Sequence, residues 1–187
     1  MPREVELKSV VDDIDACRRR LEAAGAAVTF DGRQVDLRYD TAERKLGDAD
    51  EVLRVRSFGG AEPRAALEWK GPTRYENGYK VRDELSASTT DAAPTAAILE
   101  RLGYTVVSEI ARDVTQYALH GASIRFERYA HMDVLVEVEG EPDAIEQAIL
   151  ALGIARDRFS SDRLATFMSR FEARTGQRAV VSSRRDT

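Results

Sequence analysis

Polar and apolar residues alternate along most of this chain, which predicts a protein built mainly from β-strands. In residues 3–10, REVELKSV, Val5 and Leu7 fall on one face and Glu4, Glu6 and Lys8 on the other. Later segments repeat this alternation, and their close succession favours antiparallel pairing. The further predicted strands span residues 33–41, 51–58, 65–71, 78–88, 113–120, 123–128 and 134–140.

Other segments have helical periodicity. In residues 12–26 the apolar residues Ile14, Cys17, Leu21 and Ala24 recur at helical spacing, and acidic residues open the first turn. Three further helices, each with a start signal, are predicted at residues 90–103, 142–153 and 160–176. No linker divides the chain, so we expect a single domain over residues 1–175 and a mobile tail over residues 176–187.

Each predicted strand carries one charged face, and such faces usually point to water in antiparallel sheets. Three features of this chain favour the opposite orientation. The charged positions are mostly Arg and Glu with few uncharged polar residues, acidic and basic residues segregate by strand, and the amphipathic helices need an apolar surface to cover. If the helices cover the apolar faces of a closing sheet, the charged faces must point inward.

A barrel of about eight strands has an interior that holds side chains or one small ligand. Buried ions are costly unless they are paired or coordinated, so a charged interior is expected only where it binds something charged. Basic side chains on opposing walls suit a polyanion such as a phosphate chain. Clustered carboxylates suit a hard divalent cation, Mg²⁺ or Mn²⁺, that would itself bind phosphate oxygens.

Composition limits the alternatives. The 187 residues carry a formal net charge of −5 at pH 7, which argues against a general nucleic-acid binder, although positive charge can still gather locally. Cys17 is the only cysteine, so the chain has no internal disulfide and no cysteine-based metal site, which favours a reducing compartment. Because neither a signal peptide nor a membrane span is visible, we expect a cytoplasmic location and no membrane partner.

The order of several short motifs resembles one known family. Glu4-Val5-Glu6-Leu7-Lys8 resembles the N-terminal Glu-x-Glu-x-Lys signature of the CYTH domain, a family also called the triphosphate tunnel metalloenzymes. The family includes class IV adenylyl cyclases, thiamine triphosphatases and inorganic triphosphatases. The further matches follow in family order within residues 3–172 and are QVDLRYDT at 34–41, LRVR at 53–56, EWKGP at 68–72, Arg82-Asp83-Glu84, Glu137-Val138-Glu139 and FSSDRLATF at 159–167.

The resemblance implies an α+β fold, an eight-stranded antiparallel β-barrel that forms a tunnel, with helices packed on the outside. It also implies a triphosphate-containing small molecule as substrate and Mg²⁺ or Mn²⁺ as cofactor. Glu84 would be a further metal ligand or orient the nucleophile, and Lys8 would share the catalytic role. The implied metal ligands are Glu4, Glu6, Glu137, Glu139 and Glu127, and the implied phosphate-binding residues are Lys8, Arg54, Arg56, Lys70, Arg82 and Arg112.

Several positions depart from the family pattern. Val114 stands where members usually have a second basic residue on that strand, and Ser86 stands where the Arg-x-Glu strand usually continues to another Glu. Glu68 occupies a position where a small hydroxyl residue is common, and Glu127 one where Asp is usual. Arg125, on the same face as Glu127, is expected to replace the phosphate ligand lost at Val114.

Three functions fit such a tunnel. We favour hydrolysis of a triphosphate, whether inorganic, thiamine or nucleoside, because it requires no nucleoside pocket. The alternative reaction is that of a class IV adenylyl cyclase, which converts ATP to cyclic AMP and pyrophosphate. A non-catalytic sensor of polyphosphate or nucleotide is the alternative from another class, and the departures at Val114, Ser86 and Glu68 favour it. The organic part of the substrate, the preferred metal and the formation of a homodimer stay open.

Overall fold

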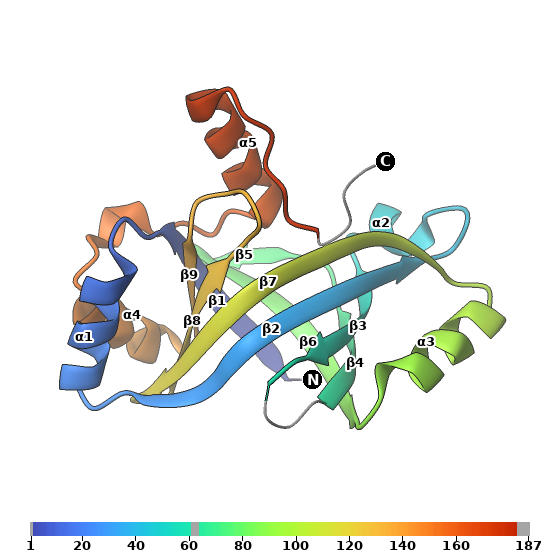
Figure 1. Ribbon diagram of the computed structural model, residues 1–187, viewed down its shortest axis with the longest axis horizontal. Coiled ribbons are helices and arrows are strands. Elements are labelled where there is room, and N and C mark those ends of the chain that lie inside the picture. Colours follow the sequence, from blue (N-terminus) through green and yellow to red (C-terminus); the bar gives the residue numbers. More distant parts are fainter. Residues whose placement is uncertain (1, 61–63, 183–187) are drawn as a thin grey trace.

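A computed structural model describes residues 2–60 and 64–182 of the chain. Its strands form one antiparallel sheet (Figure 1). The strands are β1 (Arg3–Val10), β2 (Ala27–Asp40), β3 (Val52–Phe58), β4 (Arg64–Lys70), β5 (Arg74–Glu76), β6 (Tyr79–Thr89), β7 (Thr105–Leu119), β8 (Ala122–Arg128) and β9 (Leu135–Glu139).

The sheet closes into a barrel of eight strands. The order is β1-β9-β8-β7-β2-β3-β4-β6, and a direct pairing of β1 with β6 joins the two ends. The ninth strand, β5, pairs only with β6 and lies outside the ring. The predicted eight-stranded antiparallel barrel is therefore confirmed. Because β1 and β2 are four strands apart in either direction around the ring, they form opposite walls.

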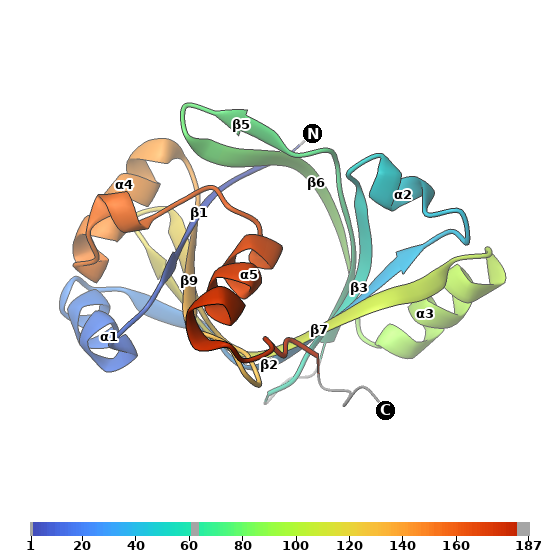
Figure 2. The same cartoon turned by 90° about the horizontal axis from the view of Figure 1, so that it is seen from above.

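The helices lie outside this ring (Figures 1 and 2). Helix α1 (Ile14–Ala23) packs beside α4 (Pro142–Leu152), and α3 (Ala92–Arg101) covers the opposite side of the barrel. Helix α5 (Leu164–Thr175) lies over one opening of the ring in Figure 2. The remaining helical turns are α2 (Lys45–Asp48) and a 3₁₀ turn, η1 (Arg156–Arg158). No helix in these described segments is both long and apolar enough to cross a bilayer.

The apolar core lies between the barrel and these helices rather than inside the barrel. On the side of α1 and α4, Leu21 and Ile145 pack against outward-facing strand residues such as Val138. On the side of α3, Leu99 packs against Val55. The apolar strand faces therefore point outward to the helices, which confirms the expected inversion of the strand faces.

An aspartate caps the start of two of these helices. Asp13 at α1 accepts a hydrogen bond from the backbone N–H three residues later, and Asp91 at α3 accepts one from the N–H two residues later.

The two longest strands exceed their predicted lengths. Strands β2 and β7 begin six and eight residues earlier than the alternation indicates, and they pair along almost their whole length. The added part of β2 contains Gly32, where a side chain would collide with the carbonyl of Gly59. The sequence analysis also did not predict three short elements, α2, β5 and η1. Their three or four residues are too few to produce a periodic pattern.

The C-terminal segment contacts the barrel over most of the part that is described. Residues 177–182 follow α5, and the backbone of Val180 pairs with that of His131. The N–H of Ala111 on β7 donates to the carbonyl of Val181 at 2.7 Å, and Ala179 is buried. The predicted mobile tail therefore has at least its first part docked, and residues 183–187 lie outside the described segments.

Candidate functional site

The inward-facing side chains enclose a charged cavity of about 360 Å³. Its walls come from all eight strands of the ring, β1–β4 and β6–β9, and basic side chains outnumber acidic ones in its lining. Arg163 and the first residues of α5, together with Gly47 and Asp50 at the α2 turn, border its mouth. Helix α5, which contributes Leu164 and Ala165 to the lining, lies over one opening of the ring in Figure 2.

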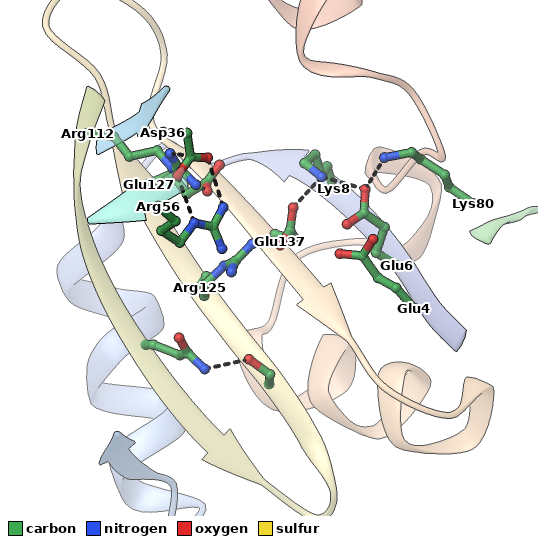
Figure 3. Close-up of polar contacts among 12 residues, drawn as sticks. Glu4, Glu6, Lys8, Asp36, Arg56, Lys80, Arg112, Arg125, Glu127 and Glu137 are labelled. Atoms are coloured by element: carbon green, nitrogen blue, oxygen red, sulfur yellow. Dashed lines mark hydrogen bonds and ion pairs between the residues drawn. The ribbon is translucent and has the colours of Figure 1, made fainter. Parts of the chain in front are cut away.

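Three buried carboxylates gather on one wall of the cavity. Glu4 and Glu6 project from β1 and Glu137 from the neighbouring strand β9, and one oxygen from each lies within 4.8 Å of the others (Figure 3). They meet because both strands alternate with the same face inward and pair in register, with Lys8 opposite Glu137. We call Glu4, Glu6 and Glu137 the acidic cluster.

The acidic cluster fits a divalent cation. Hard ions such as Mg²⁺ and Mn²⁺ take carboxylate oxygens as ligands, and the Oε2 atom of Glu4 is buried without a hydrogen-bond partner. Each carboxylate of the cluster also contacts a lysine ammonium group. The Lys70 Nζ lies 2.5 Å from Glu4, the Lys80 Nζ 2.6 Å from Glu6, and Lys8 bridges Glu6 and Glu137.

These lysines keep the acidic cluster charged. Burial by itself favours the neutral form of Glu4, but the adjacent Lys70 ammonium outweighs it and lowers the pKa of Glu4 to about 2. Burial opposes charge on Glu137 too, yet Arg125 and Lys8 hold the pKa of Glu137 well below its usual range. Both side chains are therefore carboxylates at neutral pH, which is the form that binds metal.

A group of arginines forms the facing part of the cavity. Asp36 on β2, which is 1% exposed, accepts hydrogen bonds from Arg56 Nε at 2.7 Å, Arg112 Nη1 at 3.2 Å and Arg54 Nη1 at 3.3 Å. Figure 3 shows Arg125 between Arg56 and Glu137, so it lies where this group approaches the acidic cluster. We call Arg54, Arg56 and Arg112 the arginine wall.

Several predicted phosphate ligands line the same cavity. Arg82 donates to the carbonyl oxygens of Gly71 and Asp50, each at 2.6 Å, and Arg125 pairs with Glu137. Arg125 lies on β8 two residues before Glu127, the residue that is paired with Val114. Arg125 therefore brings a cation close to the site of the lost basic residue. The cavity-lining residues among the predicted phosphate ligands are Lys8, Arg54, Arg56, Lys70, Arg82, Arg112 and Arg125.

Three other predicted carboxylates, Glu127, Glu139 and Glu84, are not members of the acidic cluster. Glu127 accepts hydrogen bonds from Arg112 Nε at 2.8 Å and from the Tyr129 hydroxyl at 2.7 Å, so it joins the arginine wall instead. Glu139 is only partly buried, and burial followed by repulsion from Glu4 raises the pKa of Glu139 to about 7. Glu84 is also partly exposed and lies 3.2 Å from Lys70.

Two departures from the family pattern face each other across adjacent strands. Glu68 on β4 is paired in register with Ser86 on β6. Family members usually carry a carboxylate at the position of Ser86. In this protein the carboxylate is at Glu68, on the neighbouring strand. Glu68 is buried and accepts a hydrogen bond from Arg54 Nε at 2.5 Å, so it neutralises part of the arginine wall.

The sequence analysis did not single out several residues of this cavity. Lys80 and Arg38 lie on the charged faces of β6 and β2, and strand alternation could have found both. Asp36 shares the inward face of β2, but its role could not be predicted from alternation alone. Its contacts with three arginines depend on the register between strands, which alternation does not provide. Tyr129 and Arg163 come from irregular segments for which alternation predicts no direction.

Comparison with known proteins places this fold and cavity in a known group. The CYTH domain model matches residues 2–150. A Methanocaldococcus jannaschii protein provisionally named an adenylate cyclase is 23% identical over 164 residues, which are 82% of this chain and 91% of that protein.

Solved structures show the same fold at low identity. One is a Vibrio parahaemolyticus protein provisionally named an adenylate cyclase, with a TM-score of 0.76, 19% identity and coverage of 89% of this chain and 97% of that one. Another is a Hippeastrum protein provisionally named an adenylyl cyclase and described as having a dominant triphosphatase activity. Its TM-score is 0.64 at 17% identity, and the match covers 90% of this chain and 96% of that one. The family model spans most of the chain, and the chain therefore belongs to the CYTH domain family.

Proposed function

We propose that this protein hydrolyses a triphosphate with the help of Mg²⁺ or Mn²⁺. The observation that carries the proposal is the pairing, within one cavity, of a three-carboxylate cluster with an arginine wall. A metal alone would need only the carboxylates, and an anion alone only the basic residues. Their combination suits a metal-bound phosphate chain.

The arginine wall would bind the phosphate oxygens. Guanidinium groups donate two parallel hydrogen bonds to such oxygens and stay charged in a buried site. Asp36 and Glu68 already hold Arg54 and Arg56 in place, so these side chains need little reorganisation when a phosphate chain binds. This preorganisation supports stabilisation of charge on the transferred phosphoryl group.

The acidic cluster would hold the metal. A divalent cation bound there would polarise a phosphoryl oxygen and lower the pKa of a bound water. Although burial opposes charge on Lys8, contacts with Glu137 and Glu6 raise its pKa above its ordinary value. Lys8 is thus a fixed positive charge for the phosphate chain rather than a base. Glu84, whose carboxylate is partly exposed beside Lys70, would orient the attacking water.

Cyclisation of ATP is the second candidate. It is favoured by two relatives that are provisionally named adenylate cyclases, from Methanocaldococcus jannaschii and Vibrio parahaemolyticus. The same metal and phosphate contacts would serve this reaction with the ribose 3′-hydroxyl as nucleophile. The uncharged residues at the cavity mouth, Val52, Leu164 and Ala165, would then lie nearest the nucleoside.

One assay separates these functions. The purified protein is incubated with Mg²⁺ or Mn²⁺ and either tripolyphosphate or ATP, and the products are separated by anion-exchange chromatography. We expect orthophosphate from at least one substrate. Cyclic AMP with pyrophosphate would instead identify a cyclase, and saturable binding without any product would identify a sensor.

The site assignment is tested by variants of the acidic cluster. Glu4→Gln and Glu137→Gln each remove a metal-ligand charge, and we expect either change to lower turnover at least about 100-fold. Glu76→Gln is the matched control, because Glu76 lies outside the barrel in an exposed ion pair with Arg3. Full activity in both cluster variants would refute the assignment.

A further inference from the structure

Arg38 differs from the other basic residues that line the cavity. Each of the others forms an ion pair with a carboxylate or, at Arg82, hydrogen bonds with backbone carbonyls. The half-buried side chain of Arg38 has no hydrogen bond or ion pair with any residue in the described segments, and its Nε atom is buried without a partner. This cation of the cavity therefore has no counter-ion among those residues.

The surroundings of Arg38 make this arrangement costly. Burial and then the nearby Arg54 guanidinium lower the pKa of Arg38 to about 10, so the group is still protonated at neutral pH but is disfavoured. A half-buried cation that lies beside another cation and has no counter-ion is unfavourable for the fold, and such groups persist where a ligand supplies the missing partner. Arg38 lines the cavity because it lies two residues after Asp36 on the inward face of β2.

The position of Arg38 indicates which part of a ligand it would meet. Arg38 is on β2, and Glu4 and Glu6 of the acidic cluster are on β1, the strand on the opposite side of the barrel. On β2 and the adjoining β3, Asp36 and Arg54 lie next to Arg38. A phosphate chain anchored by metal at the acidic cluster would cross the arginine wall before it reached Arg38.

We propose that Arg38 binds the phosphoryl group furthest from the acidic cluster and so makes the site selective for chains of three or more phosphates. This inference rests on the proposed function, because it assumes that the cavity takes a phosphate chain. By this inference a pyrophosphate held at the acidic cluster would not contact Arg38, whereas tripolyphosphate would. Arg38 thus contributes to specificity by chain length and not to general anion binding.

The variants isolate the charge of Arg38. Arg38→Gln keeps a polar side chain but removes the charge, and Arg38→Lys keeps the charge without the planar donors. Arg33→Gln is the matched control on the same strand, since Arg33 faces outward in an exposed pair with Asp113. Circular dichroism and thermal unfolding without ligand check the fold. We expect Arg38→Gln to be at least as stable as the unaltered protein, because the substitution removes a half-buried cation that has no counter-ion and is repelled by Arg54.

Binding of tripolyphosphate and of pyrophosphate is measured by titration calorimetry with Ca²⁺ in place of Mg²⁺ or Mn²⁺, so that a divalent cation still anchors the phosphate chain at the acidic cluster. Anion-exchange chromatography after each titration checks that neither ligand has been hydrolysed. We expect Arg38→Gln to weaken tripolyphosphate binding about 10- to 100-fold, the range for a lost hydrogen bond between charged groups, and pyrophosphate binding less than about 3-fold. Arg38→Lys should bind tripolyphosphate more tightly than Arg38→Gln and less tightly than the unaltered protein. Arg33→Gln should bind both ligands as the unaltered protein does.

Two results would overturn the inference. One is unchanged tripolyphosphate binding in Arg38→Gln, and the other is equal weakening of both ligands. An unaltered protein that binds neither ligand would overturn it as well. If the unaltered protein binds tripolyphosphate with the expected dependence on Arg38 but forms no product with Mg²⁺ or Mn²⁺, the proposed hydrolysis fails while the role of Arg38 stands.

Discussion

Replacement of Asp36 by asparagine tests whether the arginine wall depends on a buried counter-ion. Asp36 is almost completely buried and contacts three guanidinium groups at 2.7 to 3.3 Å. Burial favours its neutral form, but Arg54 and Arg56 outweigh burial and hold the pKa of Asp36 well below its ordinary range. Asp36→Asn keeps the shape of the side chain and removes the charge, so three buried cations lose their shared anion.

The size of the effect follows from opposing terms. A pair of unit charges 4 Å apart is worth about 4 kcal/mol at an effective dielectric constant of about 20, and Asp36 makes three such pairs. Desolvation of all four groups and repulsion among the arginines offset most of this attraction. Removal of one partner from a buried ion pair costs about 3–5 kcal/mol. For a chain of this size that loss lowers Tm by roughly 6–20 °C.

Urea unfolding followed by circular dichroism measures this loss at pH 7. Asp113→Asn is the matched control, because Asp113 makes an exposed pair with Arg33 at 3.3 Å, and it should change the free energy of unfolding by no more than about 1 kcal/mol. A loss below about 1 kcal/mol for Asp36→Asn would refute the idea that Asp36 stabilises the wall.

The same variant has a pH signature. A carboxyl group with a depressed pKa contributes its full stabilisation above its unfolded pKa of about 3.9 and loses it as the pH falls toward the lower folded value. The stability difference between the unaltered protein and Asp36→Asn should therefore be constant from pH 7 to about pH 5 and narrow below about pH 4. A difference that widened on acidification would contradict this assignment of charge.

Further changes test the other charges of the cavity. Glu68→Gln should tighten tripolyphosphate binding about 3- to 10-fold in calorimetry, because it removes a negative charge next to Arg54 and Arg56; unchanged or weaker binding would contradict this role. Chelation by EDTA should abolish product formation yet leave the far-ultraviolet circular dichroism spectrum unaltered, since lysines such as Lys70 neutralise the acidic cluster when metal is absent. Addition of Mg²⁺ or Mn²⁺ should raise the Tm of the unaltered protein but not that of Glu137→Gln, and equal shifts in both would exclude the cluster as the metal site.

The sequence alone supports a large part of this picture for a physical reason. Alternation assigns each side chain to one face of a strand, and the need of the helices for an apolar surface decides which face is inside. The convergence of Glu4, Glu6 and Glu137 follows once β1 and β9 are paired. Alternation cannot provide the register between distant strands. That register brings Asp36 to Arg112 across β2 and β7, and it also separates Glu127 from the acidic cluster.

The inverted arrangement of the barrel explains how a fold can tolerate so much buried charge. Apolar faces that would normally form the interior of a small barrel instead pack against α1 and α4 on one side and α3 on the other. Burial of apolar surface stabilises the fold there, and it does not depend on the contents of the tunnel. The lumen is then free to hold cations and carboxylates that nearly neutralise each other without ligand. No carboxylate in the described segments pairs with Arg38, and a phosphate chain that supplied an anion there would stabilise the protein as it bound.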